Sequence, residues 1–226
     1  LCGILIPQAR VASLLPTLYV LLEEKGLLDK IPGRPKAHLF SDWLIHNSQV
    51  QTLKYEMKWL NRALNKAGVK LILLKGAAYI AGNLPAAKGR LIGDIDLLVP
   101  HEKINHCEAV LCEFGWKPGE QDPYDERYYR QWMHEIPPLR HVARGSILDV
   151  PHTIIPPTAK PKLDAEKLFQ DAQEISPGIY GLAPTDMVIH SAAHLFHEGD
   201  FDHGLRDLLD LDRLLRHFGN KESQFW

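Results

Sequence analysis

Residues 71–100, LILLKGAAYIAGNLPAAKGRLIGDIDLLVP, decide how the rest of the chain is interpreted. This segment has the pattern of an apolar strand, a Lys-Gly turn, a short helix and a second strand that carries Asp94 and Asp96. Because side chains alternate along a strand, we expect the two carboxylates on one face, where they repel each other and do not help folding. Hard cations such as Mg²⁺ prefer carboxylate oxygens as ligands. The pattern therefore predicts a divalent metal site on this strand.

The composition is that of an ordinary globular protein. The chain has 226 residues, of which 45% are hydrophobic and 24% are charged, which allows one large domain or two modest ones with a real core. A formal net charge of −2 argues against bulk electrostatic binding of nucleic acid, although it leaves room for a local basic cleft. The three cysteines form no CxxC pair, which favours a reducing, cytoplasmic setting.

Neither a membrane span nor a secretion signal is predicted. No run approaches the ~20 apolar residues that a helix needs to cross a bilayer. The apolar N-terminus is interrupted by Pro7, Arg10 and Pro16 and lacks a basic leader, so we do not interpret it as a signal peptide. The chain does not begin with Met and stops soon after a strong helical pattern. We therefore expect either a fragment or a chain without its disordered ends.

Helical patterns flank the segment 71–100. Apolar spacing predicts helices over residues 11–28 and 41–67, with a loop at 29–37. Further on, it predicts a helix at 101–114, short strands between 116 and 152, and helices at 185–197 and 205–218. The last predicted strand, 146–150, places Asp149 between apolar residues. We expect an α/β (α+β) fold with a small mixed sheet, divided into an N-terminal helical region (1–68), a core (69–157) and a C-terminal helical domain (158–226).

The order of these motifs resembles the nucleotidyltransferase fold of the DNA polymerase beta superfamily, in which a glycine turn precedes two nearby carboxylates and a later third one. The chain is more similar still to a family of uncharacterised bacterial nucleotidyltransferases, over roughly residues 40 to 217. The matching motifs are Leu74-Lys75-Gly76, Arg90, Asp94-Ile95-Asp96-Leu97-Leu98-Val99, Asp149-Val150-Pro151-His152, and the C-terminal residues His194, Arg206 and Asp210.

The resemblance implies a catalytic core at 69–157 that transfers a nucleoside monophosphate from an NTP to a hydroxyl and releases pyrophosphate. Asp94 and Asp96 would hold two Mg²⁺ ions, or Mn²⁺, and through them the triphosphate, since two ions about 4 Å apart clamp both oxygens of an in-line displacement. Asp149 would complete the metal site and help to deprotonate the acceptor. The residues implied to contact the nucleotide are Lys75, Gly76, Arg90, His194 and Arg206.

The sequence allows more than one acceptor and more than one level of activity. A small molecule such as a sugar or an antibiotic, or a protein side chain, suits the near-neutral charge better than nucleic acid does. Many superfamily members carry Ser after the turn glycine as a phosphate ligand, whereas this chain has Ala77, so weak or lost activity is one alternative. The rival from another class is a non-catalytic nucleotide-binding or regulatory module that kept the fold.

Several of these residues also have structural interpretations. Asp94 and Asp96 fit a solvated strand face, Asp149 fits a strand end, and Arg90 fits an ion pair with a carboxylate. His190, His194 and His197 share one face of a helix at a spacing that can bind Zn²⁺, but no glutamate separates the first two as in HExxH sites. Packing of these histidines at an interface, or His194 lining the nucleotide cleft with Arg206 and Asp210, are the alternatives to zinc.

Overall fold

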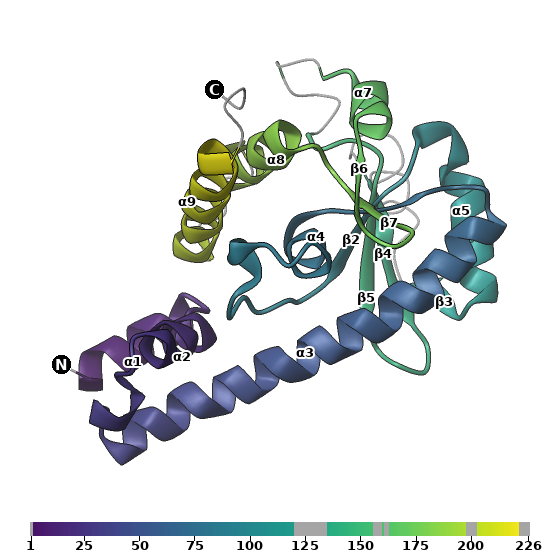
Figure 1. Cartoon of the computed structure of the whole chain (residues 1–226). Coiled ribbons are helices and arrows are strands. Elements are labelled where there is room, and N and C mark those ends of the chain that lie inside the picture. Colours follow the sequence, from purple (N-terminus) through teal and green to yellow (C-terminus); the bar gives the residue numbers. More distant parts are fainter. Residues whose placement is uncertain (1, 120–134, 156–159, 161–162, 198–202, 222–226) are drawn as a thin grey trace.

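The computed structural model describes residues 2–119, 135–155, 160, 163–197 and 203–221, and it shows an α+β protein built on one mixed sheet (Figure 1). Seven strands lie in the order β3-β4-β5-β2-β1-β7-β6. Their bounds are β1 Leu71–Leu73, β2 Ile95–Leu98, β3 Trp116–Pro118, β4 Glu135–His141, β5 Ile147–Pro151, β6 Gln173–Ser176 and β7 Ile179–Gly181. The expected small mixed sheet is confirmed.

The centre of the sheet is formed by the two strands of the segment 71–100. β1 pairs antiparallel with β2 and parallel with β7, while β2 pairs parallel with β5. Every residue of β1 and β2 is buried, so both faces of these strands are covered. This corrects the alternative of a half-exposed strand: Asp96 is buried inside β2, whereas Asp94 precedes the strand and is exposed. Because β2 is a central strand, the charged side chain of Asp96 lies in the interior of the protein.

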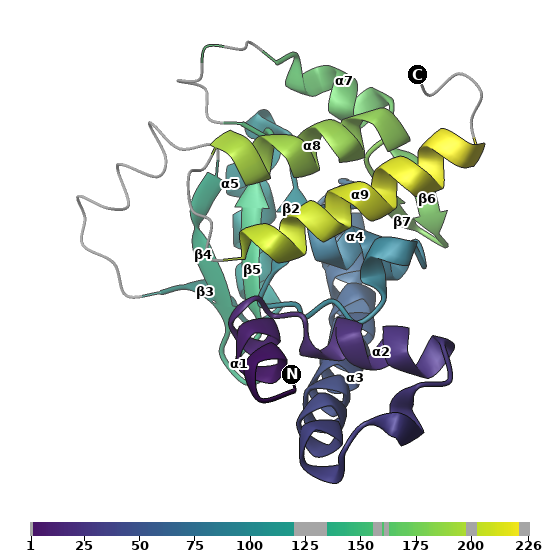
Figure 2. The same ribbon diagram turned by 90° about the vertical axis from the view of Figure 1, so that its left-hand side faces the viewer.

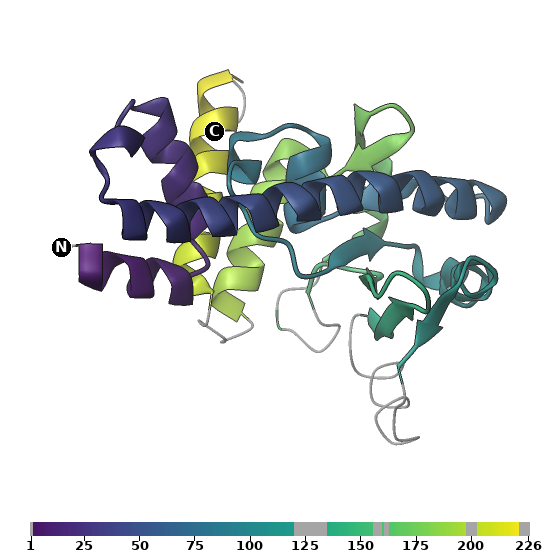
Figure 3. The same cartoon turned by 90° about the horizontal axis from the view of Figure 1, so that it is seen from below.

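Helices cover both faces of the sheet, which Figure 1 shows nearly edge-on. On one side lie α4 (Lys75–Ala81), α8 (Pro184–His197) and α9 (Gly204–Lys221), and on the other lie α5 (Ile104–Glu113) and the C-terminal half of α3 (Gly33–Lys66). Leu60 and Leu64 of α3 are fully buried against the sheet core. Figure 3 shows α3 running along the whole molecule, from the N-terminal helices to α5.

The N-terminal region forms a second, smaller core with the first turns of α3. It consists of α1 (Cys2–Val11), α2 (Leu15–Glu24) and the 3-10 turn Leu28–Lys30, and its buried residues include Leu15, Tyr19 and Leu39. Two expectations were wrong here, because α1 was not predicted and the loop at 29–37 becomes helical from residue 33. The reason is that Leu39 packs against α2, and Pro35 lies in the first turn of α3, where proline is tolerated.

The C-terminal region contributes strands as well as helices. Besides α7 (Ala165–Gln170), α8 and α9, it supplies β6 and β7, which sequence patterns did not predict because both strands are short and β6 carries mostly polar residues. α8 and α9 pack together across one face of the sheet (Figure 2). Short 3-10 turns at Pro85–Ala87 and His101–Lys103 complete the described elements. Among the described helices, none combines the length and the apolar character that a bilayer crossing requires.

Candidate active site

The side chains of Asp96 and Asp149 meet at the centre of the sheet. β2 and β5 run parallel, and their register places Asp96 directly opposite Asp149. β1 adds the third residue, because its chain continues into α4 at Lys75, whose φ of 45° is unusual for a residue other than glycine. The ammonium of Lys75 lies 3.1 Å from Oδ1 of Asp96. We call Asp96 and Asp149 the carboxylate pair.

Asp96 is kept ionised although it is buried. Burial alone raises the pKa of this carboxyl, but the ammonium of Lys75, with smaller contributions from His190 and Arg90, more than offsets that effect and lowers the pKa below its ordinary value. His190 lies buried on α8, so this helix faces the carboxylate pair. Lys75 was predicted as a phosphate contact, and in the structure its ammonium forms an ion pair with Asp96.

Asp149 is in the opposite electrostatic state. Burial, followed by the nearby charges of Asp96, Asp94 and Glu135, raises the pKa of Asp149 to about 8. Its Oδ1 is buried and has no hydrogen-bond partner among the described residues. A buried polar atom without a partner is costly for folding and is a common mark of a functional site. Asp149 is thus an acid that needs either a proton or a cation.

These residues fit a divalent cation. Carboxylate oxygens suit Mg²⁺, and a cation between Asp96 and Asp149 would satisfy the orphaned oxygen and relieve the repulsion that raises the pKa of Asp149. Asp94 lies near enough to contribute to that repulsion, although it is exposed. Within the described part of the chain, no three His, Cys, Asp or Glu side chains are already arranged as a ligand set. The residues that fit a divalent cation are therefore the carboxylate pair, with Asp94 as an exposed neighbour.

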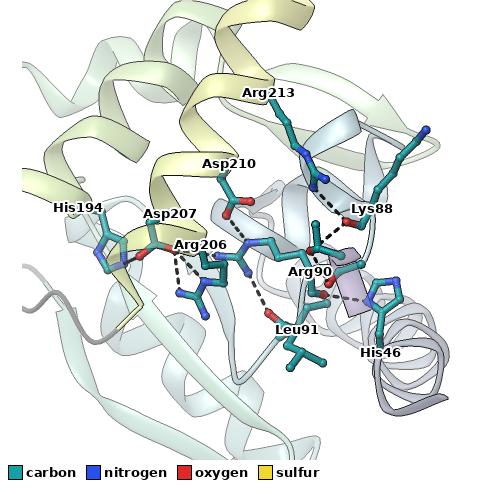
Figure 4. A network of polar contacts seen from close by, with 12 residues as sticks. His46, Lys88, Arg90, Leu91, His194, Arg206, Asp207, Asp210 and Arg213 are labelled. Atoms are coloured by element: carbon teal, nitrogen blue, oxygen red, sulfur yellow. Dashed lines mark hydrogen bonds and ion pairs between the residues drawn. The ribbon is translucent and has the colours of Figure 1, made fainter. Parts of the chain in front are cut away.

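Arg90 occupies a buried position beside α4, where the structure shows an ion pair (Figure 4). Its Nε donates to Oδ2 of Asp210 at 2.6 Å, its Nη1 donates to the carbonyl of Leu91, and its guanidinium lies over the ring of Tyr79. Burial raises the pKa of Asp210, and Arg90 opposes that shift. This geometry is the ion-pair alternative that the sequence had left open for Arg90.

The position of Arg90 explains why residue 76 is a glycine. A Cβ added to Gly76 would lie 2.1 Å from Nη1 and 2.9 Å from Cζ of Arg90, far inside contact distance. The turn glycine thus makes room for the guanidinium, which presses on the first turn of α4. Ala77, the departure from the Gly-Ser pattern, is buried with only 1% of its surface exposed.

The remaining predicted nucleotide contacts gather around Asp207 on α9. Nη2 of Arg206 lies 2.8 Å from Oδ1 of Asp207, while Nη2 of Arg90 and Nε2 of His194 each lie 3.9 Å from its carboxylate. We call Arg90, Arg206, Asp207 and Asp210 the arginine cluster (Figure 4). His194 borders it, so the C-terminal motif residues His194, Arg206 and Asp210 are brought together, although Asp207, which lies between them, was missed.

Besides Asp207, sequence reasoning missed His46. His46 of α3 donates from Nδ1 to the carbonyl of Arg90 at 2.9 Å, and burial lowers the pKa of this imidazole. Asp207 lies three residues before Asp210 on the same helix face, and that spacing was the available signal for it. For the zinc alternative, His190 is buried and His194 borders the arginine cluster, but the side chain of His197 lies outside the described residues.

Comparison with known proteins identifies the family. A model of a family described as uncharacterised nucleotidyltransferase matches residues 4–226, nearly the full length of the chain. No curated protein and no solved structure matches the chain. The family match supports a nucleotidyltransferase role in general terms and agrees with the carboxylate pair at the centre of the sheet. The chain therefore belongs to the family of uncharacterised nucleotidyltransferases.

Proposed function

We propose that this protein is a Mg²⁺-dependent, cytoplasmic nucleotidyltransferase that moves a nucleoside monophosphate from an NTP to a hydroxyl-bearing acceptor. The observation that carries the proposal is the carboxylate pair: two acidic side chains in register, one ionised beside Lys75 and one with an orphaned buried oxygen and a pKa of about 8. Nothing in the sheet requires two adjacent carboxylates, and a bound cation would stabilise them.

Asp94, Asp96 and Asp149 would hold Mg²⁺, or Mn²⁺ in its place, which would neutralise charge on the triphosphate and fix the reacting groups in line. Lys75 would turn from Asp96 to the triphosphate once a cation takes over the carboxylate, because its ammonium is already within 3.1 Å of that site. The acceptor oxygen would form a bond to the α-phosphorus while the bond to the bridging oxygen breaks and pyrophosphate leaves. The proton of the acceptor would pass to Asp149.

Arg90 would position neighbouring elements rather than bind the nucleotide. Arg90 joins α4 to α9 through Asp210, and its charge also helps to lower the pKa of Asp96. Since its guanidinium is engaged by two carboxylates, we assign it the role of holding the C-terminal helix against the active-site turn. The side chains of Arg206 and His194 are partly exposed, at 15% and 24%. Because a nucleotide could reach them, they stay candidates for contact with it.

The second candidate function is a non-catalytic nucleotide-binding module. Two observations favour it: the ammonium of Lys75 forms an ion pair with Asp96 and lowers its pKa, and Ala77 offers no hydroxyl to a phosphate. The two functions differ in their need for metal, because a module of this kind would bind NTP with Lys75 alone, whereas the enzyme would require Mg²⁺ at the carboxylate pair.

The test is transfer of an α-labelled nucleotide in the presence of Mg²⁺, with ATP, GTP, CTP and UTP in turn, monitored as labelled product and as pyrophosphate. We expect Asp96→Asn to lose the activity while keeping its circular dichroism spectrum. Asp212→Asn is the matched control, since Asp212 pairs with Arg216 on the exposed side of α9. Metal-independent nucleotide binding, with no labelled product from any of the four nucleotides, would favour the non-catalytic module.

A further inference from the structure

A pocket with both polar and apolar walls opens beside Asp94, where β2 and β5 begin. Its volume is about 260 Å³. Three segments form its walls: the middle of α3 with Ser48, Gln49 and Thr52, the approach to β2 from Ile92 to Ile95, and the turn into β5 from Arg144 to Ile147. These segments are distant in the sequence and meet only through folding. None of the residues in the arginine cluster lines the pocket.

The wall formed by the turn into β5 is held in place by a buried carboxylate. Glu56 on α3 has no exposed surface, and both of its oxygens accept from Arg144, at 2.6 Å from Nε and 2.7 Å from Nη2. Ser146 donates to the same carboxylate at 2.7 Å. The guanidinium also lies over the rings of Tyr55 and Trp116. Bidentate pairing of this kind fixes geometry, so this wall exists before any ligand arrives.

The opposite wall is tied to α3 as well. The side-chain oxygen of Gln49 accepts from the backbone N–H of Ile92 at 3.0 Å, which fixes the approach to β2 just before Asp94. Asp94 in turn lies near enough to Asp149 to contribute to the rise in its pKa. Ile147 also lines the pocket, and it lies two residues before Asp149 on β5, so the two side chains share a face of the sheet. The pocket therefore borders the carboxylate pair at Asp94 and Ile147, and a ligand in it would lie beside the group that takes the acceptor proton.

The lining indicates what kind of ligand fits. The volume of the pocket is at the small end of the range for ligand sites, so the pocket suits a single ring rather than a whole NTP. The hydroxyls of Ser48 and Thr52 and the amide of Gln49 offer hydrogen bonds, while Ile92 and Ile147 offer apolar contact. Arg144 is neutralised by Glu56, and Asp94 leaves the lining without a net positive charge, so an anionic ligand is disfavoured.

We infer that this pocket is the acceptor site and that it binds a small, uncharged or cationic polyhydroxylated ring, such as a monosaccharide, an amino sugar or a cyclitol. This inference rests on the proposed function, because it assigns the acceptor hydroxyl to the side of the carboxylate pair that Asp94 borders. The acceptor oxygen bonds to the α-phosphorus, its proton goes to Asp149, and pyrophosphate leaves with the electron pair of the broken phosphorus–oxygen bond.

The test is saturation-transfer NMR with myo-inositol, D-glucose and D-glucosamine as probes. We expect saturable binding of at least one of them to the wild-type protein, weakened at least tenfold by Thr52→Phe, which fills the pocket from an exposed position on α3. Gln51→Phe is the matched control, because Gln51 is the exposed neighbour of Thr52 and does not line the pocket. Ser48→Phe provides a second obstruction from the same wall.

The inference would be overturned if none of the three probes bound saturably, or if Thr52→Phe and Ser48→Phe left their binding unchanged. It would also be overturned if these substitutions blocked the binding of a serine- or tyrosine-bearing peptide and did not affect the ring compounds. The nucleotide experiment stays independent of these results. If labelled product forms in wild type and in Thr52→Phe alike, the pocket assignment fails and the nucleotidyltransferase survives. If ring compounds bind but no nucleotide does, the proposed function fails instead.

Discussion

The carboxylate pair and the arginine cluster are both groups of buried and half-buried charges, yet their charges are balanced differently. In the arginine cluster, the guanidinium groups of Arg90 and Arg206 face the carboxylates of Asp207 and Asp210, so two positive charges meet two negative ones. In the carboxylate pair, Lys75 supplies one positive charge against two acids. The first group is complete, and the second needs one more cation or a proton.

This difference separates a structural group from a functional one. A buried network with balanced charges and hydrogen bonds orders the fold, here by joining α4 to α9 through Arg90 and Asp210. A buried acid with an orphaned oxygen is a weak point of the fold, which is retained where chemistry requires it. Variants that change the charge balance should therefore have opposite effects in the two groups.

The largest effect is expected from Arg90→Met. The substitution leaves Asp210, which is only 3% exposed, without its cation, so we expect a loss of ~3–5 kcal/mol in the free energy of unfolding. Chemical denaturation measures it directly. Arg216→Met serves as control, because Arg216 pairs with Asp212 on the surface, where solvent screens the pair and its contribution to stability is small. A loss as small as that of the control would show that the arginine cluster is not a structural anchor.

Asp149→Asn should stabilise the metal-free protein, and the gain should grow with pH. Asp149 has a pKa of about 8 in the folded state and an ordinary value near 4 in the unfolded chain, so the folded protein holds one more proton between these values. Wild-type stability therefore falls as pH rises through this window, and a variant without the acid escapes that fall.

We expect the difference between Asp149→Asn and wild type to increase by about 2–4 kcal/mol from pH 5 to pH 8. Denaturation curves at a series of pH values in the presence of a chelator measure it, and Asp164→Asn, an exposed acid that caps α7, controls for a generic charge effect. A difference that does not change with pH would mean that Asp149 is ionised in the folded protein without any cation.

A smaller effect is expected from Gly76→Ala. The new methyl group would displace the guanidinium of Arg90, which Asp210 holds at 2.6 Å, and overpacking of this kind costs about 1–3 kcal/mol. Gly33→Ala is the matched control, because nothing lies within 4 Å of its added Cβ. In an Arg90→Met background, the cost of Gly76→Ala should largely vanish, and strict additivity of the two changes would contradict the contact.

Sequence patterns predicted the core of the site because its parts are local. The apolar runs around Asp96 and Asp149 predict two buried strands, and the Lys-Gly turn lies within the same 30-residue segment as Asp96. Which strands pair is a matter of tertiary structure, but two acidic residues inside apolar strands have few other places to meet than the centre of a sheet.

The rest of the site depends on contacts that sequence spacing does not encode. The ion pair of Arg90 with Asp210 joins residues 120 positions apart, so Arg90 could equally be predicted as a phosphate ligand. Gly76 suggested a close approach of phosphate, whereas the structure puts the guanidinium of Arg90 there. The strands β6 and β7 are short, and they exist because β1 offers its free edge to β7. Tertiary packing overrides local propensity in each case.

The most direct test of the proposed metal site is isothermal titration of the protein with Mg²⁺ and a non-hydrolysable NTP at pH 7, in buffers of different ionisation enthalpy. Because Asp149 holds a proton at this pH, we predict Mg²⁺-dependent binding that releases about one proton, and no such release in Asp149→Asn. Nucleotide binding that needs no Mg²⁺ and releases no proton in either protein would contradict a metal site at the carboxylate pair.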